Sequence, residues 1–365
     1  MNLYDKELRA LKKSGRYRTR EVLNTSLYDF ASNDYLGLSH NKALHISTCK
    51  ELERYPMNNS KASMLVNGYH QIHKDFEDAL CAANDFEAGI VLGSGFNANI
   101  ALIEALVRRG DTLFIDELYH ASGVLAAGLN NLHVVFFKHN DMNELRTLLK
   151  KSDAKRKIVA VEGIYSMDGD LCDKEVFSIC DEAEALLIVD EAHSSGVIGD
   201  KLMGVFDYYN IAVKENHIKM GTLGKAYGSF GAFILASNHI IEYLLNRAKP
   251  VIYATSLSLY DTLLAHNALK YILANTSMLK KEIALRKKII YEELGLHVDG
   301  LIVPILIGDN KKVIEIKNSL LDDNYSVGAI RQPTVSSAII RLIARLGESS
   351  DSLRFVCKKL AQYKK

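Results

Sequence analysis

The chain of 365 residues has little net charge, little proline and no long apolar run. A formal net charge of +1 creates no field that would attract nucleic acid or an anionic membrane, so neither is expected as a main partner. No run approaches the roughly 18 apolar residues of a membrane-spanning helix, and residues 1–20 lack the apolar centre of a signal peptide. With four prolines and no linker-like stretch, the composition predicts a globular protein with a sizeable core.

The sequence also lacks the common motifs of disulfide, nucleotide and metal sites. The five cysteines are odd in number and show no C-x-x-C spacing, so we expect reduced thiols in the cytoplasm. The G-x-G-x-x-G fingerprint is absent, which argues against a nucleotide-binding oxidoreductase. The segment around Lys225 fails the P-loop pattern, because Lys219 and Ala226 stand where glycine and Ser or Thr are required. No H-E-x-x-H motif surrounds His70 and His73, and no metal site is expected.

From about residue 75, short apolar runs alternate with longer amphipathic segments. The apolar runs lack polar alternation, which predicts strands buried on both faces. They span residues 89–93, 112–116, 134–137, 157–163, 186–190, 217–222 and 231–236. The segments between them carry helical periodicity. We therefore predict an α/β fold, with a mostly parallel seven-stranded sheet covered by helices on both faces.

The ends of the chain differ in pattern from this middle part. A long helical stretch covers 257–294, and a smaller mixed unit follows, with 301–308 and 339–343 as its clearest strands. We predict an N-terminal arm (1–32), a large α/β domain (33–270) and a small α+β domain (271–365). The basic stretch from Lys12 to Arg20 has a polar helical pattern, typical of a solvated arm or of a ligand-binding segment.

Polar residues follow five of the apolar runs, where the carboxyl ends of parallel strands bind ligands. They are the turn at Gly95, His120, Ser166, Asp190 with His193, and Lys225. Each alone has a structural alternative: a tight turn for the glycine, a helix cap for the aspartate, a buried structural role for the histidines. Together, an amine for a Schiff base, an acid for a ring nitrogen and a phosphate-binding turn are what pyridoxal phosphate requires.

Seven motifs then occur in order along the chain: SNDYLGLSHN (32–41), GSGFNANIA (93–101), ELYHAS (117–122), EGIYSMDGD (162–170), DEAHSSGVIG (190–199), TLGKAYG (222–228) and IYATS (252–256). In these motifs the chain resembles the α-oxoamine synthases, pyridoxal-phosphate enzymes of the aspartate-aminotransferase fold type, fold type I. The resemblance extends from about Tyr28 to Leu346. EGIYSMDGD and the pair DEAHSSG and TLGKAYG are its most specific parts.

The resemblance implies roles for residues around the cofactor. Lys225 would hold pyridoxal phosphate as a Schiff base and later move the substrate Cα proton, Asp190 would pair with the pyridine nitrogen, and His120 would stack on the ring. The other residues implied to contact the cofactor are Gly95, Phe96, Ser166, His193, Thr222 and Thr255. Because Thr255 would reach the phosphate of a neighbouring subunit, the active unit is expected to be a homodimer.

The resemblance also implies a substrate site. Arg341 would bind the amino-acid carboxylate, and Asn33 and Glu162 would lie near the substrate. Arg16 or Arg18 matches a further arginine that contacts substrate, and the sequence leaves the choice between them open. In the segment 58–66, Lys61, Met64 and Leu65 replace residues that are usually small, which changes the expected acyl-chain pocket.

A protein of this family condenses an amino acid with an acyl thioester, with loss of CO2, to give an amino ketone. SNDYLGLSHN and the compact length resemble the members that join L-alanine to a pimeloyl thioester, carried on coenzyme A or acyl carrier protein, in biotin biosynthesis. Close alternatives are glycine with acetyl-CoA or succinyl-CoA and serine with a long acyl group. An alternative of another class is a non-catalytic protein on the same scaffold. The presence of Asp190, His193 and Lys225 together argues against it.

Overall fold

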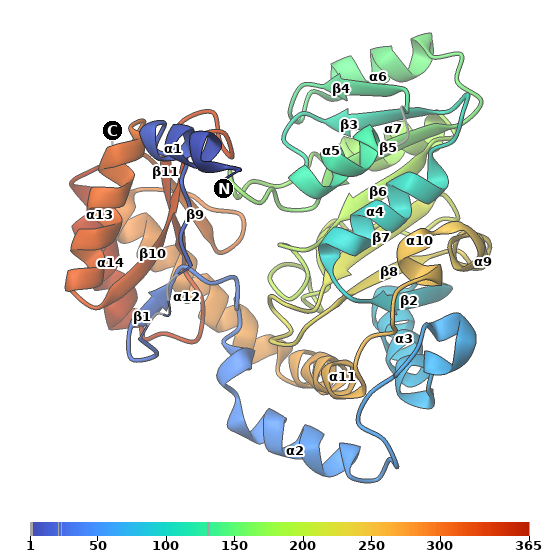
Figure 1. Cartoon of the computed structure of the whole chain (residues 1–365), viewed down its shortest axis with the longest axis horizontal. Coiled ribbons are helices and arrows are strands. Elements are labelled where there is room, and N and C mark those ends of the chain that lie inside the picture. Colours follow the sequence, from blue (N-terminus) through green and yellow to red (C-terminus); the bar gives the residue numbers. More distant parts are fainter. Residues whose placement is uncertain (1–2, 21, 23, 130–131, 365) are drawn as a thin grey trace. The chain divides into compact units, whose positions relative to one another are not determined.

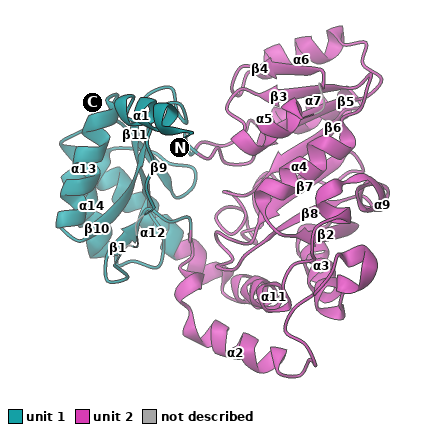
Figure 2. Ribbon diagram, in the orientation of Figure 1, with its two compact units in different colours: residues 1–33, 167–169, 282–365 teal, residues 34–166, 170–281 magenta. Residues whose placement is uncertain are grey.

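The computed structural model describes residues 3–20, 22, 24–129 and 132–364 (Figure 1). Its contacts divide the chain into two compact units, shown in Figure 2. Unit 1 comprises residues 1–33, 167–169 and 282–365, and unit 2 comprises residues 34–166 and 170–281. Among the described residues, no helix combines the length and apolarity needed to cross a membrane.

Unit 2 is built on a sheet that has seven strands among the described residues. In spatial order these are β2 (Ala88–Leu92), β8 (Ala232–Ala236), β7 (His217–Thr222), β6 (Leu186–Asp190), β5 (Lys157–Glu162), β3 (Thr112–Asp116) and β4 (Val134–Phe137). The strands from β7 to β4 pair in parallel, and β8 is antiparallel to both β7 and β2. The predicted α/β fold with a mostly parallel seven-stranded sheet is confirmed.

Most positions of the central strands are apolar because both faces of the sheet are covered. Ile188 of β6 belongs to a core cluster that also contains side chains of α4 (Gly95–Leu106), α5 (Ala121–Gly128), α9 (Asn238–Arg247) and α10 (Lys249–Ile252). Leu187 and Val189 point to the opposite face, since successive side chains of a strand alternate. All three are fully buried. Helix α7 (Glu175–Glu182) packs against β6 and supplies buried side chains outside that cluster.

The other helices of unit 2 are α2 (Lys42–Leu52), α3 (Gln71–Asn84), α6 (Met142–Lys151), α8 (Val205–Tyr208) and α11 (Leu259–Ala274), with a 3-10 turn at Leu38–His40 and a π-helical turn at Met64–Gly68. Helix α12 (Thr276–Leu294) begins in unit 2 and continues into unit 1. The helical stretch predicted over 257–294 is therefore two helices, which are separated at Asn275, where φ is −116°.

Unit 1 has a sheet of four strands among the described residues, in the order β1 (Tyr28–Phe30), β10 (Tyr325–Ile330), β11 (Ile339–Ile343) and β9 (Ile302–Leu306). Strand β1 pairs with β10 in parallel, and the other pairs are antiparallel. Helices α1 (Asp5–Lys13), α13 (Asn310–Asp322) and α14 (Ser350–Ala361) complete the unit. The two strands predicted in this region are confirmed as β9 and β11. The predicted domain boundary at 270/271 stays a prediction.

The helical pattern proposed from Lys12 to Arg20 was wrong beyond Lys13. Helix α1 ends there, with Ser14 at its C-cap, and Gly15 adopts a φ of +67°. A residue with positive φ directly after a helix ends the helical hydrogen-bond pattern, and glycine adopts this conformation without a steric penalty. Residues 14–20 continue as an exposed chain segment.

Gly204 adopts a left-handed backbone conformation and lies directly against Glu191. Its φ is +95°, and a Cβ at this position would overlap the carboxylate of Glu191. Gly110 has a similar φ of +91° but no atom within 4 Å of an added Cβ. We expect Gly110→Ala to cost about 1–3 kcal/mol through backbone strain, which is several degrees in Tm. Gly204→Ala should lower the Tm further, because Glu191 must also move. Calorimetric unfolding of both variants measures this, and equal Tm losses would contradict the steric argument.

Candidate active site

Eight of the predicted site residues line one cavity of about 190 Å³ in unit 2. They are Gly95, Phe96, His120, Glu162, Asp190, His193, Thr222 and Lys225. Asn99, Ala192 and Met220 complete the lining. Parallel pairing aligns Glu162 at the end of β5 with Asp190 at the end of β6, and Asp190 with Met220 on β7. The polar residues therefore gather because the parallel strands end at the same edge of the sheet.

Asp190 is 4% exposed and is held by two donors. Its Oδ2 accepts a hydrogen bond from Nδ2 of Asn99 at 2.9 Å, and its Oδ1 accepts one from the backbone N–H of Ala192 at 3.0 Å. The Oδ1 of Asn99 accepts in turn from the hydroxyl of Tyr119 at 2.7 Å. Asp190 thus accepts a hydrogen bond from the backbone that follows it and also lines the cavity. The capping role and the ligand-binding role that the sequence left open are therefore compatible with each other. Asn99 and Tyr119 were not predicted, although both lie inside motifs noted above.

Glu162 lies beside Asp190 and is almost fully buried. Burial raises the pKa of Glu162 well above its usual value, and the negative charge of Asp190 adds to the effect. The Oε2 of Glu162 accepts a hydrogen bond from the N–H of Ser166 at 2.9 Å, whereas its Oε1 is buried with no partner among the described residues.

Lys225 and two histidines occupy another side of the cavity. The Nζ of Lys225 lies 2.7 Å from Nε2 of His193, whose Nδ1 lies 2.5 Å from the hydroxyl of Tyr35. The Nδ1 of His120 contacts Oγ of Ser122 at 2.7 Å. Burial lowers the pKa of His120, an effect that the charge of Asp190 opposes and that of Lys225 reinforces. His120 is therefore neutral at physiological pH.

The N-terminus of α4 lies at the cavity, which Gly95 and Phe96 both line. The helix begins at Gly95, and Ser94 caps it by accepting from the N–H groups of Asn97 and Ala98. The N–H groups of Gly95 and Phe96 come first in the helix and have no intrahelical partner. A Cβ on Gly95 would lie 3.6 Å from that of Thr222, so this turn lies close to the end of β7. Free amides and the helix dipole favour an anion here.

The other predicted site residues do not line this cavity. Ser166 is buried, and Thr255 is exposed. In unit 1, Nη1 of Arg341 donates to Oδ1 of Asn33 at 2.9 Å. Arg16 and Arg18 both line a second cavity of about 210 Å³ in unit 1, together with residues 329–334, so the structure does not choose between them.

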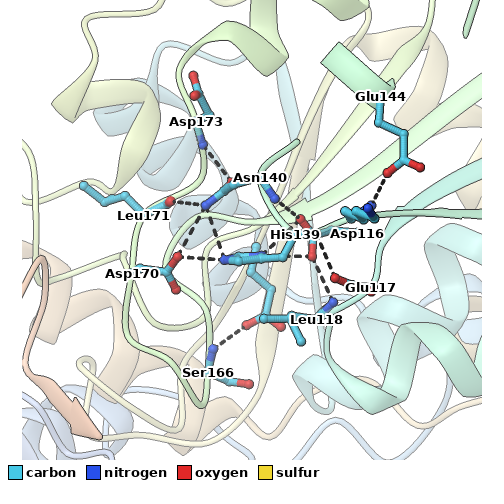
Figure 3. A network of polar contacts seen from close by, with 12 residues as sticks. Asp116, Glu117, Leu118, His139, Asn140, Glu144, Ser166, Asp170, Leu171 and Asp173 are labelled. Carbon is cyan, nitrogen blue, oxygen red and sulfur yellow. Dashed lines mark hydrogen bonds and ion pairs between the residues drawn. The ribbon is translucent and has the colours of Figure 1, made fainter. Parts of the chain in front are cut away.

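A charged network supports the loops next to the cavity (Figure 3). His139 lies between two carboxylates, with its Nδ1 3.1 Å from Asp116 and its Nε2 2.7 Å from Asp170. The adjacent Asn140 donates its side-chain N–H to the carbonyl of Leu171 at 2.9 Å. Burial alone would lower the pKa of His139, but the hydrogen bonds and charges of both carboxylates raise it to about 10. The network joins the end of β3, which precedes His120, to the segment after Ser166.

His139→Gln should destabilise the fold in a pH-dependent manner. The folded-state pKa of about 10 lies above the ordinary value of about 6.5, so the charged histidine stabilises the fold fully below pH 6.5. This contribution is lost as the pH rises through about 10. The Tm difference between the native chain and His139→Gln should therefore be largest near pH 6 and shrink toward pH 10.5. His239→Gln, at an exposed position of α9, is the control. A pH-independent difference for His139→Gln would contradict the assigned charge.

Curated relatives match the chain along its whole length. It is 40% identical to an 8-amino-7-oxononanoate synthase of Helicobacter pylori (strain J99 / ATCC 700824) over 365 residues, which covers 100% of this chain and 98% of that protein. It is 35% identical to an 8-amino-7-oxononanoate synthase of Geotalea daltonii, covering 94% of this chain and 92% of that protein. The predicted resemblance is thereby confirmed.

Solved structures share the fold. A serine palmitoyltransferase of Sphingomonas wittichii superposes with a TM-score of 0.88 at 22% identity, covering 100% of this chain and 98% of that one. An 8-amino-7-oxononanoate synthase of Francisella tularensis gives a TM-score of 0.76 at 26% identity, covering 93% and 98%. The model of the aminotransferase class I and II family matches residues 25–360. The chain therefore belongs to the class I and II aminotransferase family and, within it, to the α-oxoamine synthases.

Proposed function

We propose that this chain is a pyridoxal-phosphate-dependent acyltransferase that condenses L-alanine with a pimeloyl thioester to give 8-amino-7-oxononanoate, a step of biotin biosynthesis. One observation carries the proposal: a lysine amine, a buried carboxylate and a helix N-terminus surround a single cavity at the ends of the parallel strands. The names of full-length relatives at 34–40% identity support the choice of reaction.

The residues of the cavity fit pyridoxal phosphate. The N–H groups of Gly95 and Phe96 would hold the phosphate, and the carboxylate of Asp190 would keep the pyridine nitrogen protonated. The amine of Lys225 would bind the aldehyde carbon. The unpartnered Oε1 of Glu162 leaves a buried polar atom for a bound molecule to satisfy. When bound, pyridoxal phosphate supplies an electron sink for negative charge at the amino-acid Cα.

The chain's own side chains would move and hold protons around that centre. The amine of Lys225 would take the proton from Cα, with His193 in direct contact with its Nζ. A neutral His120 would pack against a cationic ring without charge repulsion, since burial lowers its pKa. Asn99 would keep the Asp190 carboxylate oriented, because its side-chain amide donates to Oδ2.

Substrate recognition would use cationic side chains. Arg341 would pair with the amino-acid carboxylate, and Asn33 would orient its guanidinium through the 2.9 Å hydrogen bond. Arg16 or Arg18 would attract the anionic groups of the thioester, coenzyme A or acyl carrier protein. The second candidate is a related enzyme that uses a different acyl chain, as glycine C-acetyltransferase does. It is favoured by Lys61, Met64 and Leu65, which replace residues that are usually small.

The proposal includes a homodimer with shared active sites, in the cytoplasm. Thr255 is exposed and follows Tyr253, which is 78% exposed. Large apolar side chains are also exposed in the π-helical turn, at the start of α4 and shortly before β8; they are Leu65, Val66, Phe96 and Phe230. We take them as part of the interface, since large apolar side chains that gather in an exposed patch mark contacts between protein chains. Thr255 would then bind the cofactor phosphate of the neighbouring subunit.

A substrate panel tests the reaction. The purified protein, loaded with pyridoxal phosphate, is given L-alanine, glycine or L-serine with pimeloyl, acetyl, succinyl or palmitoyl thioesters, and products are identified by mass spectrometry. We expect 8-amino-7-oxononanoate, with kcat/KM for L-alanine and a pimeloyl thioester at least tenfold above every other pair. Product from glycine with acetyl-CoA would replace the proposal with the second candidate. No amino ketone from any pair would contradict both.

Mixed dimers test the role of Thr255. Thr255→Asp places a negative charge where the partner's phosphate is expected, and Lys225→Ala removes the amine, so each variant alone should have little activity. In a mixed dimer, one site carries both changes and the other carries neither. Unfolding and refolding an equal mixture should therefore restore activity. If Thr255 acts within its own subunit, every site keeps one defect and mixing restores nothing.

A further inference from the structure

Tyr35 is a fully buried tyrosine whose hydroxyl lies 2.5 Å from Nδ1 of His193. The other ring nitrogen of His193 lies 2.7 Å from Nζ of Lys225. The tyrosine ring meets the imidazole edge-on, with centroids 6.0 Å apart. Three side chains from three separate segments therefore form a continuous polar chain that ends at the amine in the cavity.

We propose that Tyr35 is a positioning residue that sets the protonation of His193, so that His193 receives the proton carried by Lys225. This inference rests on the proposed function, in which Lys225 takes a proton from Cα and must release it before the next cycle. Without a nearby acceptor, the lysine would pass that proton to water.

The chemistry of the two contacts fixes the direction of the hydrogen bonds. A lysine ammonium is a donor only, so it requires the lone pair of Nε2 on His193. The neutral imidazole then carries its single proton on Nδ1 and donates it to the Tyr35 oxygen. When a proton passes from Nζ to Nε2, the lysine becomes a neutral amine and the ring becomes an imidazolium. Tyr35 continues to accept from Nδ1. The imidazolium later returns the proton to Nζ, from which it passes to the product Cα after CO2 has left, so no other reactant is consumed.

The loop that carries Tyr35 is packed against the turn that carries Lys225. Gly228 has a φ of +60°, and a Cβ there would lie 2.5 Å from the backbone nitrogen of Ser39. Asp34 accepts hydrogen bonds from the hydroxyl of Ser39 at 2.5 Å and from its N–H at 3.4 Å, which closes the loop. This close backbone approach keeps the Tyr35 hydroxyl at a fixed distance from the lysine turn.

Other ionisable groups line the same cavity and share its electrostatics. Asp190 on β6, Glu162 on β5 and His120 before α5 all lie in its lining with His193. The negative charge of Asp190 favours a positive charge nearby, on Lys225 or on His193. The hydrogen bond from Nδ1 to Tyr35 favours the imidazolium, because an acceptor at Nδ1 stabilises the ring that carries both protons.

Tyr35→Phe tests the inference in the protein without cofactor. Protein labelled with 15N-histidine reports the tautomer of His193 by NMR, and the signal is assigned by its loss in His193→Asn. We expect Nδ1 to be protonated in the native chain and the signal to shift toward the Nε2-protonated form in Tyr35→Phe. Because this readout needs no substrate, it stays valid if the substrate panel identifies another reaction.

The loaded enzyme provides a second readout. Tyr35→Phe should lower kcat by about tenfold or more while KM for L-alanine changes by less than about twofold, since a proton step is affected and binding is not. Added to His193→Asn, Tyr35→Phe should have no further effect. Tyr227→Phe is the matched control, because Tyr227 is equally buried near Lys225 and its hydroxyl has no partner among the described residues. Unchanged His193 signals, or equal kcat losses in Tyr35→Phe and Tyr227→Phe, would overturn the inference.

Discussion

The parallel pairing of β5, β6 and β7 is the constraint on which the candidate site depends. Because the strands are in register, Glu162, Asp190 and Met220 end side by side. Two buried carboxyl groups cannot both ionise at such close range without a large cost in free energy. Burial and the nearby charge of Asp190 raise the pKa of Glu162 well above its usual value. Asp190 instead accepts hydrogen bonds from Asn99 and Ala192. One register thus gives two neighbouring carboxyl groups different surroundings.

The same strand end is also anchored from the opposite face of the sheet. Glu191 follows Asp190, so its side chain points away from the cavity. It is fully buried and accepts hydrogen bonds from the N–H of Val205 and the hydroxyl of Ser194. Lys219 of β7 is buried beside it at 3.5 Å. Burial lowers the pKa of Lys219, and the charge of Glu191 opposes this effect. This buried pair holds the turn that carries His193.

The sequence predicted the central sheet well for a physical reason. A strand that is buried on both faces is apolar at most positions, so the central runs could be recognised without any partner information. Strands β1 and β10 were missed, because β1 has three residues and half of β10 is only partly buried. The eight predicted residues that line the cavity lie at or shortly after strand ends. The residues that support them were not predicted: Tyr35, for example, lies in a loop without periodicity and contacts a histidine 158 residues away.

The most direct test of this account is the identity of the lysine that holds the cofactor. The protein is incubated with pyridoxal phosphate, reduced with borohydride to make the attachment permanent, digested, and searched for the modified peptide by mass spectrometry. The account predicts the modification on Lys225, within TLGKAYG, and no specific modification when Lys225 is changed to Ala. Attachment at another lysine, such as Lys219, or no specific attachment, would contradict the central claim that this cavity is the active site.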